Sequence, residues 1–377
     1  MPTDTPAPFP HWMLKEIHEQ PSTLVATLEQ YVDGKGFRED TCSAARAWLA
    51  AAKGEIVVAA SGSSRHAGLV AELLIEDLSG IAVDVEYASE YSYRSEKSLK
   101  DAAVIVVSQS GETADTLSAL RKAAAVGHKT LAVTNVPAST MAKEATVSFP
   151  TLAGRERAIP ATKSFTAQLL VLHLLALLAA QAREALSSKV VQEHLDQLAK
   201  LPKLMETQLP MWVEKVKQVA DEYKPFRNFL FLGRGVHYPI AREGALKLKE
   251  SSYLHAEGYP SGELKHGPNA LVSEGTPLVM IATVDRNDAE SVLRYEKIVH
   301  LMKDMRTQGA NILAIANEGD GEVEALATAV IPVVAASETA LTLLEVVPLQ
   351  LLSYFMAINN GIDVDRPRNL VKAVVQE

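Results

Sequence analysis

Motifs from the first half of the sequence return in the second half at a nearly fixed spacing. The segment ATVSFP (145–150) corresponds to ATAVIP (327–332), 182 residues later, and Glu156 corresponds to Glu338 at the same spacing. Other matched pairs are 127–135 with 309–317, His66 with His237, and 87–89 with 259–261. The repeat requires the chain to fold into two similar units, each built on the same order of elements.

Both copies alternate short β-rich runs with helical segments. Strands are expected at 55–60, 82–88, 103–108, 130–135 and 147–149, and again at 229–233, 277–283, 311–317 and 329–334. Helices are expected at 66–78, 113–126, 162–182, 238–254, 287–308 and 339–359. This order predicts an α/β fold: tandem doubly wound parallel sheets with helices on both faces.

The repeat also sets the expected domain limits. We expect an N-terminal tail and helical lead-in (1–45), a first domain (46–185), a helical connector (186–225), a second domain (226–360), and a C-terminal tail (361–377) that closes the site.

Composition narrows the class of protein. The net charge of −9 and the lack of a Lys/Arg block argue against nucleic acid or an anionic membrane as a partner. A single cysteine, Cys42, excludes a disulfide framework and fits a reducing cytoplasm. The start of the sequence lacks the features of a signal peptide, and the apolar run 169–180 is shorter than a membrane span, so a buried helix is expected. No metal-ligand cluster or cofactor is expected.

Residues 104–116, VIVVSQSGETADT, place a hydroxyl-rich turn between a buried strand and a helix. One interpretation is a local N-cap formed by Ser110 or Thr113. The other is an anion site, because a helix N-terminus presents free N–H groups and Gly111 permits close backbone approach. The expected phosphate-binding residues are Ser108, Gln109, Ser110 and Thr113, completed by Ser63 and Ser64 at the neighbouring strand end.

The second copy provides an internal control for this turn. At the equivalent position it carries ATVDRN (282–287), without the hydroxyl-rich pattern. A structural cap would be expected in both copies, so a turn found in only one favours phosphate binding. A dinucleotide site is not favoured, because Tyr238 stands where the glycine fingerprint after Gly233 and Gly235 needs a third glycine.

The second copy carries a different set of polar residues. Glu243, Lys247 and Glu250 fall on one face of an expected helix, which could be a solvent-exposed stripe worth about 0.3–0.5 kcal/mol per ion pair. The helix, however, follows the ligand-facing end of a strand, and an irregular segment containing His266 comes next. This placement favours a functional role.

Several long motifs in the same order resemble a known family. They are SQSGETADT (108–116), ASEYSYR (88–94), EGALKLKE (243–250), GELKHGP (262–268) and DVDRPRNL (363–370). Over residues 11–377 the chain resembles the isomerase half of glutamine:fructose-6-phosphate aminotransferase, or glucosamine-6-phosphate synthase, which consists of two sugar-isomerase (SIS) domains.

The resemblance implies roles for particular residues. Glu250 matches the base that moves a proton between C1 and C2, and Glu243 and Lys247 match supporting residues. His266 matches the ring-opening histidine, which the family supplies from the neighbouring subunit, so a homodimer is expected. Lys372 matches the tail lysine that forms an imine with an open-chain ketose. These residue types suit aldose–ketose chemistry, which needs a base, a proton shuttle and an amine.

The sequence also departs from the family pattern. Position 2 is Pro where the family has a glutaminase nucleophile, so no glutaminase domain is expected. Ala161 replaces a serine near the sugar and Pro160 is unusual, which leaves the sugar epimer open. The segment ATKS (161–164) looks more like the stand-alone SIS enzymes, including glucosamine-6-phosphate deaminases.

The expected function is interconversion of glucosamine 6-phosphate with fructose 6-phosphate and ammonia, with deamination favoured in the absence of a glutaminase. Simple isomerisation is one alternative. A second is an aminotransferase subunit that takes ammonia from a separate glutaminase, and a third is a non-catalytic sugar-phosphate-binding regulator. The expected location is cytoplasmic.

Overall fold

The computed structural model describes residues 6–52, 54–95 and 102–375. Residues 1–5 of the expected N-terminal tail and residues 376–377 of the expected C-terminal tail lie outside these ranges. The chain forms two compact units, named here by their sheets. The first-sheet unit comprises Ser22–Glu156, Lys163–Ala199 and Val371–Glu377; the second-sheet unit comprises Met1–Pro21, Arg157–Thr162 and Lys200–Leu370.

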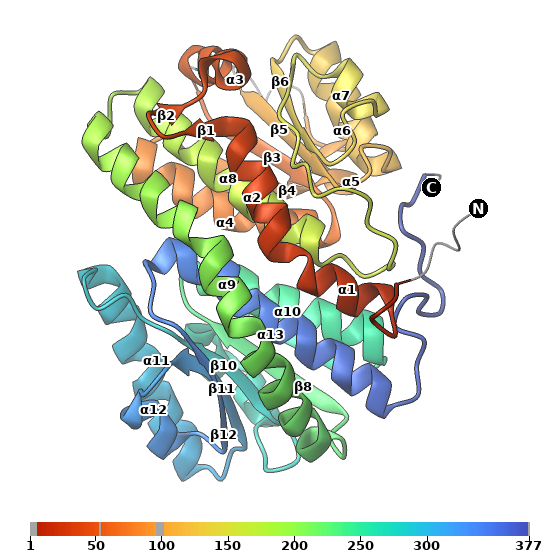
Figure 1. The fold of residues 1–377 in the computed structure, drawn as a ribbon, viewed down its shortest axis with the longest axis vertical. Helices are drawn as coiled ribbons and strands as arrows, with labels where there is room; N and C mark the ends of the chain where they lie inside the picture. Colours follow the sequence, from red (N-terminus) through yellow and green to blue (C-terminus); the bar gives the residue numbers. More distant parts are fainter. Residues whose placement is uncertain (1–5, 53, 96–101, 376–377) are drawn as a thin grey trace. The chain divides into compact units, whose positions relative to one another are not determined.

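The first-sheet unit is built on five parallel strands in the order β4-β3-β5-β6-β7 (Figure 1). The strands are β3 (Ile56–Ala60), β4 (Val83–Tyr87), β5 (Ala103–Ser108), β6 (Thr130–Thr134) and β7 (Val147–Ser148). The helices are α3 (Glu39–Ala51), α4 (Gly62–Ser79), α5 (Ala88–Tyr91), α6 (Ala114–Ala125), α7 (Thr140–Glu144) and α8 (Lys163–Ala182), and a short hairpin pairs β1 (Val32–Asp33) with β2 (Gly36–Phe37).

Helices cover both faces of this sheet, as its sequence pattern requires. The central strands β3 and β5 are apolar on both sides and buried throughout, whereas the edge strand β4 (VDVEY) alternates apolar and acidic residues. Val57 and Val104 pack with α5 and α6 on one face. On the other face, Gly68 of α4 lies so close to Val58 that an added Cβ would come within 3.0 Å of it. Burial on both faces is the pattern of a doubly wound parallel sheet.

The second-sheet unit repeats this plan with the strand order β12-β11-β10-β8-β9. Its strands are β8 (Asn228–Gly233), β9 (His255–Pro260), β10 (Leu278–Ala282), β11 (Ile312–Asn317) and β12 (Ala329–Val333). Its helices are α1 (Trp12–His18), α10 (His237–Ser252), α11 (Ala289–Thr307), α12 (Gly321–Leu326) and α13 (Glu338–Asn359), with 3-10 turns η2 (Ser261–His266) and η3 (Pro268–Leu271). Two of the boundaries between the units fall within helices, one in α2 (Gln20–Tyr31) and one in α9 (Ser188–Tyr223).

The predicted fold class is confirmed, and two local expectations are wrong. The helix expected from residue 66 begins at Gly62, so Ser63 and Ser64 lie in its first turn instead of a loop. Residues 255–260, expected to be irregular, form the parallel edge strand β9 beside β8. Glu and Gly are poor strand formers, but Gly258 allows β9 to lie against the Arg242 backbone of α10, where a Cβ would come within 2.6 Å.

Two helices, α8 and α13, are long and apolar enough to cross a membrane by length and composition alone. Helix α8 extends the apolar run beyond the length expected from residues 169–180, so the length argument against a span is wrong. In both helices 89% of the most apolar window is buried within the protein. Burial of this extent is typical of central core helices, which pass the same test.

Candidate functional site

The first sheet changes winding direction between β3 and β5. Helix α4 leads from β3 to β4 on one side, and α6 leads from β5 to β6 on the other. The β3–β5 register ends with Ala60 opposite Val107, so residues 61–64 and 108–113 leave neighbouring strand ends. Ligands of open α/β sheets bind at such switch points, and the predicted phosphate-binding residues lie there.

The turn between β5 and α6 holds its hydroxyls in fixed positions. Ser108 Oγ lies 3.0 Å from Thr113 Oγ1 and accepts a hydrogen bond from the Gly111 N–H at 3.2 Å. Ser110 Oγ accepts from the Glu112 N–H at 3.1 Å. The Glu112 carboxylate accepts from the Thr140 N–H at 2.8 Å and is thereby fixed to α7. The turn is therefore preorganised.

Gly111 is required at its position by both conformation and space. Its φ is +66°, and a Cβ there would lie 2.2 Å from Ser139 Oγ. Its carbonyl accepts from the Met141 N–H at 3.1 Å, and the Gln109 carbonyl accepts from the Asn135 N–H at 3.1 Å. These bonds attach the turn to β6 and α7, so a ligand would meet a rigid backbone.

The first turns of the two equivalent helices are capped differently. In α11 the Asp288 side chain accepts hydrogen bonds from the N–H groups of Glu290 at 2.9 Å and Ser291 at 3.3 Å. In α6 the N-cap residue Thr113 makes no side-chain capping bond. The N-cap of α11 is therefore a carboxylate, whereas the N-cap of α6 is an uncharged hydroxyl residue, with Asp115 as the acidic residue of its first turn. An uncharged N-cap is compatible with an anion at this helix end.

The C-terminal tail contacts this edge of the first-sheet unit. The Val374 carbonyl accepts from the Ala114 N–H, in the first turn of α6, at 3.0 Å. Lys372 Nζ lies 2.5 Å from Glu156 Oε2. The predicted imine-forming lysine and the predicted phosphate turn thus belong to the same unit.

The predicted face of α10 is not a solvent-exposed stripe. The side chains of Glu243 and Lys247 are 0% and 1% exposed, and that of Glu250 is 22% exposed. Lys247 Nζ lies 3.6 Å from Glu243 Oε1 and makes a second, shorter ion pair with Glu250. The ammonium thus lies between two carboxylates, and Glu250 is the member of the triad that reaches solvent.

His266 ends the 3-10 turn η2 and is exposed. Two interactions anchor this turn. Arg234 Nε donates to Ser261 Oγ at 3.1 Å, and the Leu264 side chain is buried. The described contacts do not join His266 to Glu250. An exposed histidine on an anchored turn is free to meet a ligand or a second chain.

A buried ionic cluster, which the sequence did not predict, lies at the switch point of the second sheet. His237 Nδ1 lies 3.0 Å from Glu345, and its Nε2 forms an ion-pair contact of 3.3 Å with Glu338 Oε1. Arg294 Nε donates to Glu338 at 2.8 Å, and Thr283 donates to Glu345. The matched pairs His66/His237 and Glu156/Glu338 were the only sequence signal of this cluster.

This cluster predicts a loss of stability at alkaline pH. Burial disfavours the charged imidazolium, but Glu345 and Glu338 outweigh it and raise the pKa of His237 from 6.5 to about 9. A histidine whose pKa is higher in the folded than in the unfolded protein stabilises the fold while it is protonated. This contribution is complete below the pKa of the unfolded state and is lost as the pH rises through the pKa of the folded state. We expect the free energy of unfolding to fall by about 2 kcal/mol between pH 7 and pH 9.

The measurement is urea unfolding of the wild type and His237→Gln at pH 7, 8 and 9. The variant should be less stable at pH 7, and the difference between the two proteins should shrink by about 2 kcal/mol at pH 9. Parallel pH dependences would show that His237 is not held charged in the folded protein.

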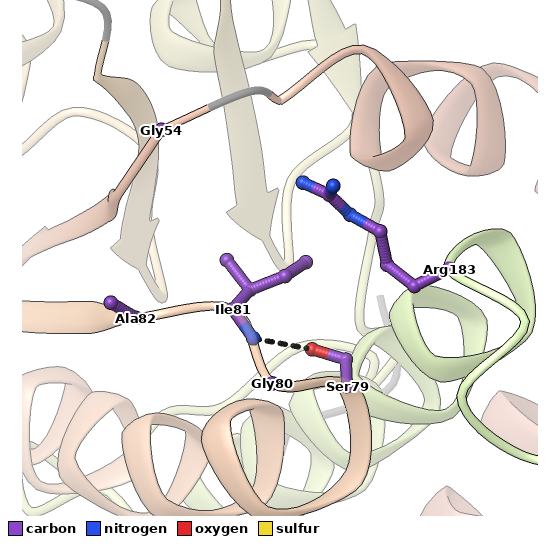
Figure 2. Close-up of a pocket in the computed structure, with 6 residues that line it drawn as sticks. All are labelled: Gly54, Ser79, Gly80, Ile81, Ala82 and Arg183. Atoms are coloured by element: carbon purple, nitrogen blue, oxygen red, sulfur yellow. Dashed lines mark hydrogen bonds between the residues drawn. The ribbon is translucent and has the colours of Figure 1, made fainter.

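The cavity shown in Figure 2 lies elsewhere in the first-sheet unit. It has a volume of about 260 Å³ and is lined by Gly54, Ser79, Gly80, Ile81, Ala82 and Arg183. Gly54 precedes β3 and Ala82 precedes β4, so the cavity lies at the N-terminal ends of the strands. This is the edge opposite the phosphate turn, where doubly wound sheets do not place their active sites.

Within residues 6–52, 54–95 and 102–375, no three His, Cys, Asp or Glu side chains are grouped to hold a metal ion.

The protein is a tandem repeat of doubly wound α/β sheets. One of the two sheets carries a rigid, hydroxyl-lined turn at its switch point, where proteins of this class bind ligands. A family model described as "SIS domain" matches residues 49–178 and 224–360. The chain belongs to the SIS-domain family.

Similar proteins support this assignment. A glutamine–fructose-6-phosphate aminotransferase (isomerizing) of Chlorobaculum tepidum is 43% identical over 98% of this chain and 59% of its own length. The chain spans about three fifths of the length of the curated relatives it matches.

Two solved structures share the fold over nearly the whole chain. The C-terminal domain of a glucosamine-fructose-6-phosphate aminotransferase from Francisella tularensis has a TM-score of 0.87 and 34% identity, and covers 96% of this chain and 99% of that one. A glucosamine-6-phosphate deaminase from Thermotoga maritima has a TM-score of 0.72 and 26% identity, with 96% and 99% coverage.

Proposed function

We propose that the protein interconverts glucosamine 6-phosphate with fructose 6-phosphate and ammonia. The observation that carries the proposal is the preorganised hydroxyl turn at the N-terminus of α6, with Lys372 held in the same unit. The relatives named above act, by their names, on glucosamine or fructose 6-phosphate. A phosphate dianion suits the hydroxyls and the positive helix end.

We assign the phosphate to six residues that follow the ends of β3 and β5. They are Ser63, Ser64, Ser108, Gln109, Ser110 and Thr113. Each offers a hydroxyl or amide donor, and the rigid turn spares the ligand most of the entropic cost of ordering its site.

In the proposed mechanism, His266 opens the sugar ring by moving a proton between O1 and O5. Glu250 then removes the C2 proton and returns it to C1, which converts the 2-amino aldehyde into a C2 imine. The Lys372 amine displaces ammonia from C2 to form its own imine, and water releases fructose 6-phosphate and the free amine. Lys247 and Glu243 fix the position and charge of Glu250.

Because His266 is exposed, we propose that it serves a neighbouring copy in a homodimer, and that the protein acts in the cytoplasm. The second candidate function is ammonia-dependent synthesis in the reverse direction, with a separate glutaminase chain as the ammonia source. The 43% identity to an aminotransferase supports this second candidate. The same residues would catalyse both directions.

The test supplies purified protein with glucosamine 6-phosphate and measures ammonia and fructose 6-phosphate. We expect both products in equal amounts, and the reverse reaction when fructose 6-phosphate and ammonium are supplied. Ammonia-dependent synthesis without measurable deamination would favour the second candidate. Turnover of a different aldose or amino-sugar phosphate, with neither deamination of glucosamine 6-phosphate nor the reverse synthesis, would contradict the substrate assignment.

A further inference from the structure

Glu156 is a buried carboxylate that precedes α8 and lies outside every local motif of the sequence. Its side chain is 0% exposed. Oε1 accepts from the Ser164 N–H at 3.1 Å, and Oε2 accepts from the Ser164 hydroxyl at 2.6 Å. Ser164 lies in the first turn of α8, so the helix N-terminus fixes this carboxylate and stabilises its charge. These contacts do not involve the tail and would persist without it.

The partner of Glu156 comes from the C-terminal tail. Lys372 Nζ lies 2.5 Å from Oε2, and the lysine side chain is only 25% exposed. The neighbouring tail residues Val371, Val374 and Val375 are each more than half exposed, so apolar burial contributes little to holding the tail. The polar attachments of this stretch include the Glu156 ion pair and the hydrogen bond from the Ala114 N–H to the Val374 carbonyl.

The internal repeat shows what is unusual about this pair. Glu338, the counterpart of Glu156, binds Arg294 of α11 and His237 of α10, both of which belong to the packed core elements of the second-sheet unit. In both copies the glutamate next to the start of the last helix binds a cation. In the first copy that cation is carried by the C-terminal tail instead of by a packed helix.

We propose that Glu156 is the docking carboxylate that positions Lys372 and the C-terminal tail for the reaction. The inference rests on the proposed function for its catalytic consequence and on the structure alone for the docking. A salt-bridged ammonium has no lone pair, so it cannot attack C2. The pair must therefore open, with the ammonium proton passing to Glu156 or water, before the amine forms the imine and ammonia leaves.

The first test measures docking without turnover. Trypsin cleaves after Lys372, and the docked side chain should resist it. Glu156→Gln keeps the size and removes the charge; its amide oxygen can still accept from the Ser164 N–H, and its amide nitrogen can donate to the Ser164 hydroxyl. We expect cleavage after Lys372 to accelerate about tenfold in this variant, because proteolysis follows the population of the open tail. Glu144→Gln, which removes an exposed ion-paired glutamate of the same unit, is the matched control and should not change the rate.

The second test measures positioning in the reaction. Fructose 6-phosphate with sodium borohydride should link covalently to Lys372, with borohydride reducing the imine to a secondary amine detectable by peptide mass. In Glu156→Gln we expect about tenfold less trapping and a lower kcat with unchanged KM, and Glu156→Asp should recover part of both. Unfolding midpoints of the variants establish that the fold is intact.

The outcomes separate the two claims. Unchanged cleavage and unchanged trapping in Glu156→Gln would overturn the role of Glu156. Absence of trapping and turnover in the wild type would instead overturn the proposed function, and the cleavage rates alone would then decide whether Glu156 docks the tail.

Discussion

Glu250→Gln is expected to lower kcat by about 10²–10⁴-fold, the range that a positioned general base contributes. Glutamine fills the same space but cannot accept the C2 proton. Glu250 is the partly exposed member of a triad whose other two members are buried, so it alone can reach a substrate from solvent. The measurement is the rate of ammonia release from glucosamine 6-phosphate.

Binding separates a catalytic from a structural effect in this variant. The phosphate-binding residues belong to the other unit, so we expect Glu250→Gln to bind glucosamine 6-phosphate within a few-fold of wild type by calorimetry. Glu324→Gln, on the exposed helix α12 of the same unit, should retain full turnover. A Glu250→Gln enzyme that keeps wild-type kcat would exclude Glu250 as the base.

Lys247→Met is expected to destabilise the second-sheet unit by about 3–5 kcal/mol, the effect of removing one partner from a buried ion pair. Methionine has nearly the length of lysine, so the lost stability reflects the missing charge more than a missing volume. Without the ammonium, the carboxylate of Glu243 remains buried beside Glu250, and like charges repel. The measurement is urea unfolding followed by circular dichroism.

Lys249 provides a matched control for this prediction. It lies two residues further along α10 and is exposed, so Lys249→Met should change the free energy of unfolding by less than about 0.5 kcal/mol. The double variant Glu243→Gln/Lys247→Met removes the buried charge along with its partner and should recover part of the lost stability. Equal effects at positions 247 and 249 would contradict the burial of the triad.

The α/β elements could be predicted because their apolar pattern follows directly from where they are buried. The strand at residues 103–108 agrees with β5 at both ends, since a fully buried parallel strand reads as an unbroken apolar run. Strand β9 could not be predicted in this way. Its sequence, HAEGYP, is polar and contains glycine. It forms a strand because it pairs in parallel with β8 and packs against α10.

The site was predictable to the extent that it rests on local sequence. The turn around Gly111 carries its own signal, because small hydroxyl residues and a glycine follow a buried strand. The ion pair between Glu156 and Lys372 joins residues more than two hundred positions apart, and no local pattern announces it. The burial of Lys247 between two carboxylates was likewise hidden, since the same spacing occurs on exposed helices.

The sequence by itself determined the twofold plan of the protein, the doubly wound class and the place of the hydroxyl turn. Each of these depends on periodicity and repetition, which are properties of the chain. Only the tertiary structure decided which charges are buried, which cation each glutamate meets, and that His237 lies between Glu338 and Glu345. Those outcomes depend on the packing of elements distant in sequence, because a charge is stabilised or destabilised by its neighbours in space.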